Sequence, residues 1–213
     1  RVPTVGIQSS VGVPNAPFAV WLYALPYALS PDPLFASLAT GVANVAAVGG
    51  LWWLLRREWG RASSLVGGLL YAASPYGAFY SRAVWSQDLL GPLAVAWAAA
   101  AVHGVARGRG WALAACVLLA GLTPQVHYAG AALLIPTAFL VVRHRLWRRW
   151  GAILAGATPA ALAAVPFALA LGRSGAVGRL VGAMGPRGTE APLAGPLRFL
   201  EMAIGRAWEW FLL

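Results

Sequence analysis

The amino-acid sequence predicts an all-α membrane protein: a polytopic bundle of about six membrane-spanning helices with further helices at the membrane surface. Hydrophobic residues make up 60% of the 213 residues and charged residues only 10%, whereas soluble domains carry about 25% charged residues. The apolar residues also form long blocks separated by short polar stretches, which is the pattern of helices that cross a bilayer.

Six segments are expected to span. The clearest is 33–55, "PLFASLATGVANVAAVGGLWWLL", which at 1.5 Å per residue covers about 35 Å, enough for a hydrocarbon core of about 30 Å. Pro124 is expected to separate the fourth segment from the fifth, because proline starts helices well and fits poorly within them. The fourth segment is short, so we expect it to tilt, to thin the bilayer locally or to pack inside the bundle. The other five segments are 62–80, 88–106, 110–123, 124–142 and 150–171.

Arginines predict the orientation of these segments. All sixteen basic residues are arginine, and nine of them lie in the loops after the first, third and fifth spans. The positive-inside rule assigns these alternate loops to the cytoplasm. The opposite face then receives 81–88, 123–128, everything before 33 and everything after 171, although five arginines between 173 and 206 go against the rule there. The nine loop arginines are Arg56, Arg57, Arg61, Arg107, Arg109, Arg143, Arg145, Arg148 and Arg149.

The chain divides into three parts on this interpretation. Residues 1–32 form an outer loop with an interfacial helix at 15–30, which is too short to cross and contains Pro26. Residues 33–171 form the helix bundle. Residues 172–213 form an outer loop with an amphipathic juxtamembrane helix, in which apolar residues recur at helical spacing from Leu197 to Trp208. The chain starts without methionine and stops inside an apolar stretch, so we interpret it as part of a longer protein.

Several classes of function are not expected. The net charge of +10 comes from arginine clusters between apolar runs rather than from a solvated basic face, which argues against nucleic-acid binding. The single cysteine, Cys116, excludes an internal disulfide and a multi-cysteine metal site. No P-loop, dinucleotide fingerprint, HExxH or nucleophile elbow is present. Spans almost free of charge argue against an ion pump or a proton relay.

The stretch 81–88, "SRAVWSQD", is the first candidate site. Asp88 is the only acid in the central spans, and ionisable groups at the edge of a membrane bundle often line a site. A structural role is equally open: Ser86 would cap the third span, Asp88 would complement its helix dipole and Arg82 would contact lipid phosphates.

The stretch 123–128, "TPQVHY", is the second candidate and is expected on the same face. Gln125 and Tyr128 are three residues apart and would share one side of a helix, with His127 beside them. A lone histidine is more often an interfacial residue than a base or a ligand, so both roles stay open.

Three sequence stretches together resemble the polytopic GT-C glycosyltransferases, in the branch that contains protein O-mannosyltransferases and the lipid A aminoarabinose transferase. "GIQSSVGVPNAPFAVWLYALP" resembles the end of the first outer loop of that family. "LLRREWGRASSLVGGLLYAASPYGAFYSRAVWSQDLL" and "GLTPQVHYAGAALLIP" resemble its later arginine–aspartate and histidine motifs. The resemblance extends to about residue 171.

The resemblance implies an enzyme that takes a sugar from a polyprenyl-phosphate carrier and passes it to a glycan, lipid or protein acceptor. The site would lie on the non-cytoplasmic face of the inner (plasma) membrane, with cationic groups or a divalent metal steadying the lipid phosphate. Arg173 and Arg179 are candidate contacts for the phosphate because of their charge and their predicted side of the membrane; no motif supports them. The implied catalytic residues are Asp88, Arg82 and His127, and the implied substrate-binding residues are Gln87, Gln125, Tyr128, Arg173 and Arg179.

One departure from the family pattern is expected to matter. The principal acid of that family follows the first spanning helix, and no acid precedes Gly6 here, so the segment alone is expected to be inactive. Two other functions stay open: part of a transporter with 121–128 as a broken-helix substrate site, and a scaffold subunit without chemistry. The use of arginine without lysine, together with abundant alanine and glycine, indicates a GC-rich bacterial genome.

Overall fold

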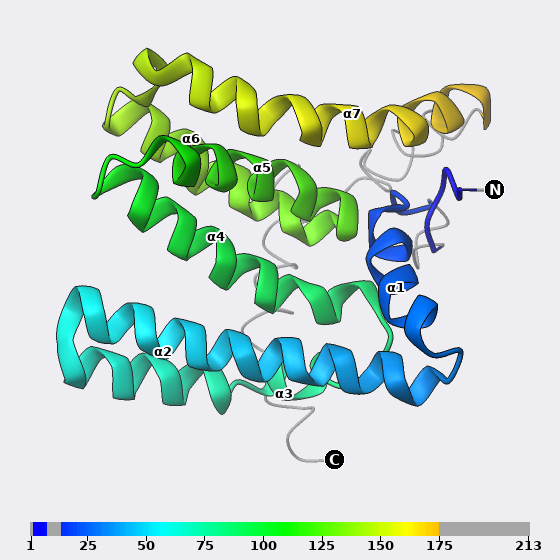
Figure 1. Cartoon of the computed structure of the whole chain (residues 1–213), viewed down its shortest axis with the longest axis horizontal. Coiled ribbons are helices and arrows are strands. Elements are labelled where there is room, and N and C mark those ends of the chain that lie inside the picture. Colours follow the sequence, from blue (N-terminus) through cyan, green and yellow to red (C-terminus); the bar gives the residue numbers. More distant parts are fainter. Residues whose placement is uncertain (1, 8–13, 175–213) are drawn as a thin grey trace, which may run out of the picture.

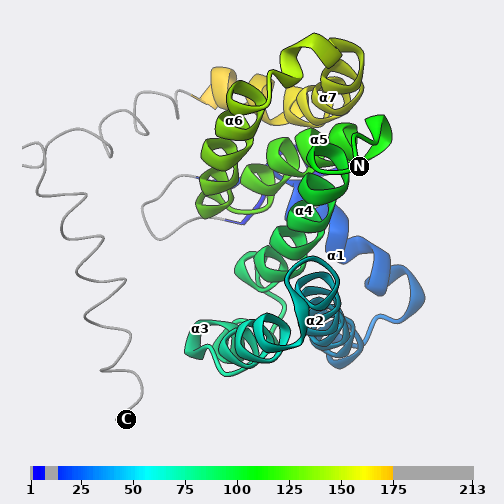
Figure 2. The same cartoon turned by 90° about the vertical axis from the view of Figure 1, so that its left-hand side faces the viewer.

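The computed structural model describes residues 2–7 and 14–174, and this part of the chain is helical almost throughout. Four helices lie side by side in the order α2, α4, α5, α7, with α6 against the flank of α5 (Figure 2). Figure 1 shows α1 crossing one end of this bundle. The all-α membrane fold is therefore confirmed. The helices are α1 (Phe18–Leu29), α2 (Pro33–Ala72), α3 (Pro75–Phe79), α4 (Leu90–Val105), α5 (Gly110–Val126), α6 (Leu134–Arg143) and α7 (Trp150–Ser174), with 3-10 turns η1 (Ser86–Leu89), η2 (Tyr128–Leu133) and η3 (Leu146–Arg149).

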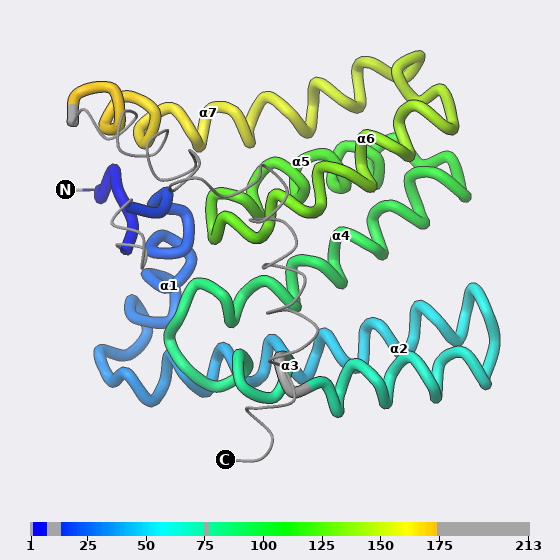
Figure 3. Tube along the Cα trace, turned by 180° about the vertical axis from the view of Figure 1, so that it is seen from behind, coloured from blue at the N-terminus to red at the C-terminus, as the bar shows by residue number. Residues whose placement is uncertain are grey.

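Helix α2 folds back on itself at Gly60, so that it forms a hairpin of two antiparallel legs (Figure 3). Gly60 has φ 88° and ψ −174°, a conformation that residues with a side chain rarely adopt. The legs pack closely, because a Cβ at Gly68 on the returning leg would lie 3.4 Å from Trp52 on the first. The hairpin thus contains the first expected span and the beginning of the second.

Three stretches of the described chain are long and apolar enough to cross a membrane: α2, Ser86–Val105 and Leu146–Arg173. Helix α5 and the stretch Tyr128–Arg143 are apolar but shorter. The expected short fourth segment is therefore present as α5, and it packs between α4, α6 and α7.

The expected helix break at Pro124 is wrong. Pro124 lies inside α5, which continues to Val126 and ends where His127 adopts an extended backbone, φ −155° and ψ 142°. Side-chain donors stabilise the turn around the proline: the Thr123 hydroxyl donates to the Leu119 carbonyl at 2.6 Å, and the Gln125 amide donates to the Gly121 carbonyl at 2.9 Å. Such bonds let spanning helices tolerate proline.

Small residues set the distances between the central helices. A Cβ at Gly104 of α4 would lie 2.7 Å from the backbone nitrogen of Leu113 of α5. A Cβ at Gly121 of α5 would lie 2.8 Å from the Cβ of Ala160 on α7. Close backbone approach through glycine and alanine is the usual way in which helices associate inside a membrane.

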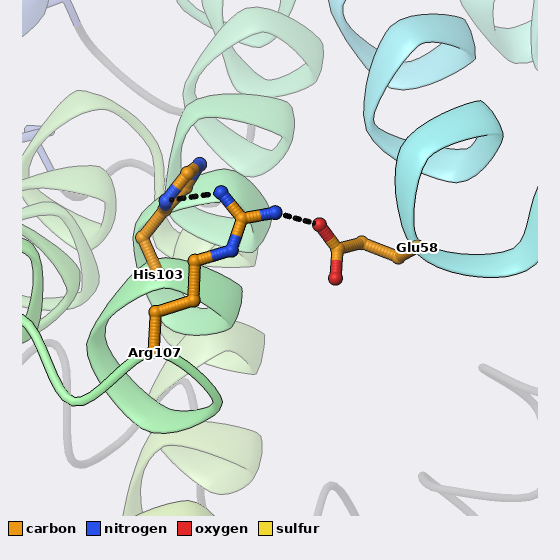
Figure 4. A network of polar contacts seen from close by, with 3 residues as sticks. All are labelled: Glu58, His103 and Arg107. Carbon is orange, nitrogen blue, oxygen red and sulfur yellow. Dashed lines mark hydrogen bonds and ion pairs between the residues drawn. The ribbon is translucent and has the colours of Figure 1, made fainter.

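The three arginine-rich turns gather at one end of the bundle, as the alternation of the loops predicts (Figure 1). Arg107, after α4, forms an ion pair with Glu58 near the turn of the α2 hairpin and lies 3.1 Å from Nδ1 of His103 (Figure 4). Arg149 of η3 donates to the carbonyl of Gly104 at 3.1 Å and to that of Gly108. Two arginines therefore tie the three turns together.

Breaking the Arg107–Glu58 ion pair is expected to destabilise the hairpin modestly. Both side chains are only 24% and 20% exposed, so we expect a coupling energy of about 0.5–1 kcal/mol, at the upper end of exposed pairs. A double-mutant cycle of Glu58→Gln and Arg107→Gln, measured as free energy of unfolding in mixed micelles, gives this value. Arg109→Gln, at an exposed position of the same loop, is the control, and a coupling energy of zero contradicts the prediction.

Candidate functional site

The end of the bundle opposite the arginine-rich turns carries both polar stretches singled out in the sequence. Two tyrosine hydroxyls connect these stretches to the N-terminal part of the chain. Tyr23 of α1 donates to the Trp85 carbonyl at 2.7 Å, and Tyr128 donates to the Pro14 carbonyl at 2.6 Å. Burial raises the pKa of the Tyr23 phenol above its usual value of 10.0, so the hydroxyl stays protonated and remains a donor.

Asp88 is fully buried, at 0% exposure, in the turn η1 that precedes α4. Its Oδ2 accepts the backbone N–H of Ala83 at 2.8 Å, which closes the loop that carries Arg82. Its Oδ1 has no partner among the described residues. The sequence left open whether Asp88 lines a site or has a structural role; in the structure its carboxylate is turned inward and holds its own loop.

Two polar residues of α2, Thr40 and Asn44, complete this buried cluster and were not singled out from the sequence. The Asn44 side-chain amide donates to the carbonyl of Asp88 at 2.9 Å and to that of Thr40 at 3.0 Å. Both residues are buried. Their spacing of four inside an apolar span puts them on one helix face, and this spacing was the available signal.

Arg82 is exposed and lies against the first leg of α2. Among the described residues, it is the only charged one that lines an open groove of about 590 Å³. The remaining lining side chains follow one face of α2 for about three turns. They are Leu34, Ser37, Leu38, Gly41, Val42, Val45 and Ala46.

The expected helix cap by Ser86 is absent between Arg82 and α4. Ser86 is buried and donates its hydroxyl to Oε1 of Gln87 at 3.0 Å, and it makes no cap for the following helix. Gln87 is partly exposed beside it. The polar stretch is thus a hydrogen-bonded loop with Asp88 inside and Arg82 outside.

Gln125 and Tyr128 do not share a helix face, because α5 ends between them. Gln125 is buried and donates to the Ala160 carbonyl of α7 at 2.8 Å. It lines a second groove, of about 570 Å³, between α5, α6 and α7. Tyr128 is exposed at the end of the bundle. Sequence spacing predicted this pair wrongly because the turn at His127 redirects the chain.

His127 is half-buried in the turn between α5 and η2. Its Nδ1 accepts the backbone N–H of Ala129 at 3.2 Å, so the neutral ring carries its proton on Nε2. Burial lowers the pKa of His127, which favours this neutral form.

The remaining candidates lie further along the chain. Arg173 is exposed near the end of α7, whereas Arg179 and the amphipathic helix expected around 197–208 lie outside the described residues. Within residues 2–7 and 14–174, no three histidine, cysteine or acidic side chains come together to hold a metal ion. Asp88 belongs to no such group among the described residues, so these residues do not by themselves fit a metal.

Comparison with known protein families identifies the family to which this chain belongs. Residues 14–170 match the model of the dolichyl-phosphate-mannose-protein mannosyltransferase family, which covers most of the chain. No curated protein and no solved structure gave a match. The matched range contains α1 to α6, most of α7, the buried Asp88 cluster and the groove beside Arg82. The chain therefore belongs to the dolichyl-phosphate-mannose-protein mannosyltransferase family, a family of membrane glycosyltransferases.

Proposed function

We propose that this protein transfers a sugar from a polyprenyl-phosphate carrier to a hydroxyl group of an acceptor on the non-cytoplasmic side of the plasma membrane. Mannose is the first sugar to test, because the family description names a mannosyl donor on a dolichyl phosphate. The observation that carries the proposal is the groove along α2, which combines an apolar face with the single guanidinium of Arg82. A polyprenyl phosphate has the matching chemistry: a long apolar chain that ends in an anion.

Arg82 is assigned to the carrier phosphate. A guanidinium presents several N–H donors in a plane and binds phosphate oxygens with two parallel hydrogen bonds. In the reaction, the acceptor oxygen forms a bond to the anomeric carbon while the bond from that carbon to the phosphate oxygen breaks. The carrier phosphate leaves with the bonding electrons, and Arg82 stabilises the negative charge that it gains.

Asp88 is assigned to the acceptor, whose hydroxyl proton passes to Oδ1. Among the described residues, Oδ1 of Asp88 is buried and has no hydrogen-bond donor, which costs free energy in the folded protein and leaves this oxygen able to accept the hydroxyl proton. Because Asp88 is buried, the substrate reaches it only when the loop 83–87 is displaced. His127 Nε2, Gln87, Tyr128 and Arg173 are assigned to contacts with the sugar or the phosphate. Gln125 lines the groove between α5, α6 and α7 instead, so it is not assigned to the substrate.

The full-length protein in native-lipid vesicles, supplied with a panel of polyprenyl-phosphate sugars, tests the proposal. We expect transfer from at least one donor, and we expect Arg82→Gln to raise KM for the carrier by roughly tenfold or more, the loss of one charge-assisted contact. Arg109→Gln is the matched control, an exposed arginine at the opposite end of the bundle.

Two results would contradict the proposal in different ways. If KM for the carrier is unchanged in Arg82→Gln, the carrier does not bind in the α2 groove, although the protein is still a transferase. If no donor is used and the vesicles instead move a solute across the membrane, the transporter interpretation replaces the enzyme.

A further inference from the structure

Most arginines at the arginine-rich end of the bundle form no ion pair with another described residue. Arg107 and Arg149 make the bonds that hold the turns together. Seven other arginines at this end are exposed and have no acidic partner among the described residues. Glu58, an acid at this end, is already paired with Arg107. These seven residues, the arginine rim, are Arg56, Arg57, Arg61, Arg109, Arg143, Arg145 and Arg148.

Tryptophans accompany the arginine rim. The guanidinium of Arg56 lies 5.6 Å from the ring centre of Trp52, and that of Arg57 lies 5.4 Å from the ring centre of Trp53. Each pair is one helical turn apart on α2. Stacking on an indole holds a guanidinium in place before any ligand arrives, so less conformational entropy is lost on binding.

The position of these tryptophans indicates the boundary of the membrane. Trp52 and Trp53 are 40% and 46% exposed, and four more exposed tryptophans lie at the same end. Indole rings concentrate at the level of lipid head groups, where one side is apolar and the other is wet. The remaining four are Trp59, Trp111, Trp147 and Trp150.

We propose that the arginine rim is a binding surface for anionic phospholipid head groups of the adjacent leaflet. A soluble anion would complement the charge of the arginines but would not contact the exposed indole side chains. An acidic phospholipid complements both, because its head group is anionic and lies at the level where indoles concentrate. Clusters of basic residues directly beside a spanning helix bind acidic lipids in this way, and the attraction falls off within a Debye length. The inference is independent of the transferase reaction, which is assigned to the opposite end.

Quenching of tryptophan emission by brominated lipids tests the surface. The protein is placed in nanodiscs that contain a minor fraction of brominated phosphatidylglycerol in phosphatidylcholine, or of brominated phosphatidylcholine in phosphatidylglycerol. Of the eleven tryptophans in the chain, nine lie in the described residues and six of these lie at the arginine end, so just over half of the emitting residues report on this surface. We expect at least about a fivefold preference for the anionic lipid at low salt, the factor that one basic group near an anionic surface supplies.

Variants and conditions then separate the possible sources of the signal. Arg56→Gln/Arg57→Gln/Arg61→Gln is expected to lose most of the preference, and the corresponding lysine variant is expected to keep much of it. Asp32→Asn, a change of one charge at the other end of the bundle, is the control and should leave the preference unchanged. Thermal unfolding of each variant checks that the fold is intact.

Three outcomes would overturn the inference. They are equal quenching by the two lipids, a glutamine variant that folds and keeps the full preference, and displacement of the lipid by inorganic phosphate at constant ionic strength. The last result would show that the surface recognises a soluble anion.

Discussion

The Asp88→Asn variant is expected to lose transfer activity without losing stability. Asparagine keeps an oxygen that accepts the Ala83 N–H, so the loop that carries Arg82 stays closed. It removes a negative charge from a position with 0% exposure and one unpartnered oxygen. A buried charge without compensation is costly, so we expect the free energy of unfolding to stay equal or to rise. Loss of the proton acceptor is expected to lower the rate by about 10²-fold or more.

Asp32→Asn is the matched control for this experiment. Asp32 lies at the same end of the bundle and caps α2 by accepting the Leu34 N–H at 2.9 Å, and asparagine caps a helix equally well. Both activity and stability are therefore expected to stay at wild-type values. Initial rates in vesicles and unfolding in micelles measure both quantities. If Asp88→Asn keeps the wild-type rate, Asp88 acts only by holding its loop and the catalytic assignment is wrong.

The Gly156→Ala variant is expected to show the largest loss of stability of any single-methyl change in α7. A Cβ at this position would collide with the backbone carbonyl of Ala114 and lie 3.0 Å from the backbone nitrogen of Leu118, both on α5. Backbone atoms in a helix cannot turn aside as a flexible side chain does, so α5 and α7 would have to separate. Overpacking of this kind costs about 1–3 kcal/mol.

Gly151→Ala provides the comparison within the same helix, since a Cβ there has nothing within 4 Å. Alanine favours the helix over glycine, so this variant is expected to match the wild type or to gain up to about 1 kcal/mol. Unfolding midpoints of the two variants in the same detergent give the difference. Equal midpoints would mean that α5 and α7 are less closely packed than the structure shows.

Hydropathy and charge predicted the arrangement of the spans because each can be read from residues that are close together in the sequence. The alternation of arginine-rich and arginine-free loops correctly placed three turns at one end of the bundle. The end of α5 was not predictable in this way. Pro124 is a strong local signal for a break, but the bonds from Thr123 and Gln125 to carbonyls one turn earlier keep the helix intact as far as Val126.

The candidate site was predictable only in part, because its contacts join residues distant in the sequence. The two polar stretches were expected at the same end, and they lie there. The position of Asp88 against α2 depends on Asn44, which is 44 positions away and donates to the Asp88 backbone carbonyl, and no local pattern specifies that bond. Gln125 shows the same limit, since its partner Ala160 lies 35 positions further on.

The reversal at Gly60 has a consequence for how the chain enters the membrane. Both legs of α2 come from one turn, and that turn holds Arg56, Arg57 and Arg61 within a few residues of the bend. Insertion of the hairpin as one unit, with these charges kept on the side of synthesis as the positive-inside rule predicts, would require only the apolar legs and the nearly uncharged segments at their ends to be translocated. The loop with Arg82 and the segment with Tyr23 would then reach the far side together, already close enough to form the Tyr23–Trp85 bond.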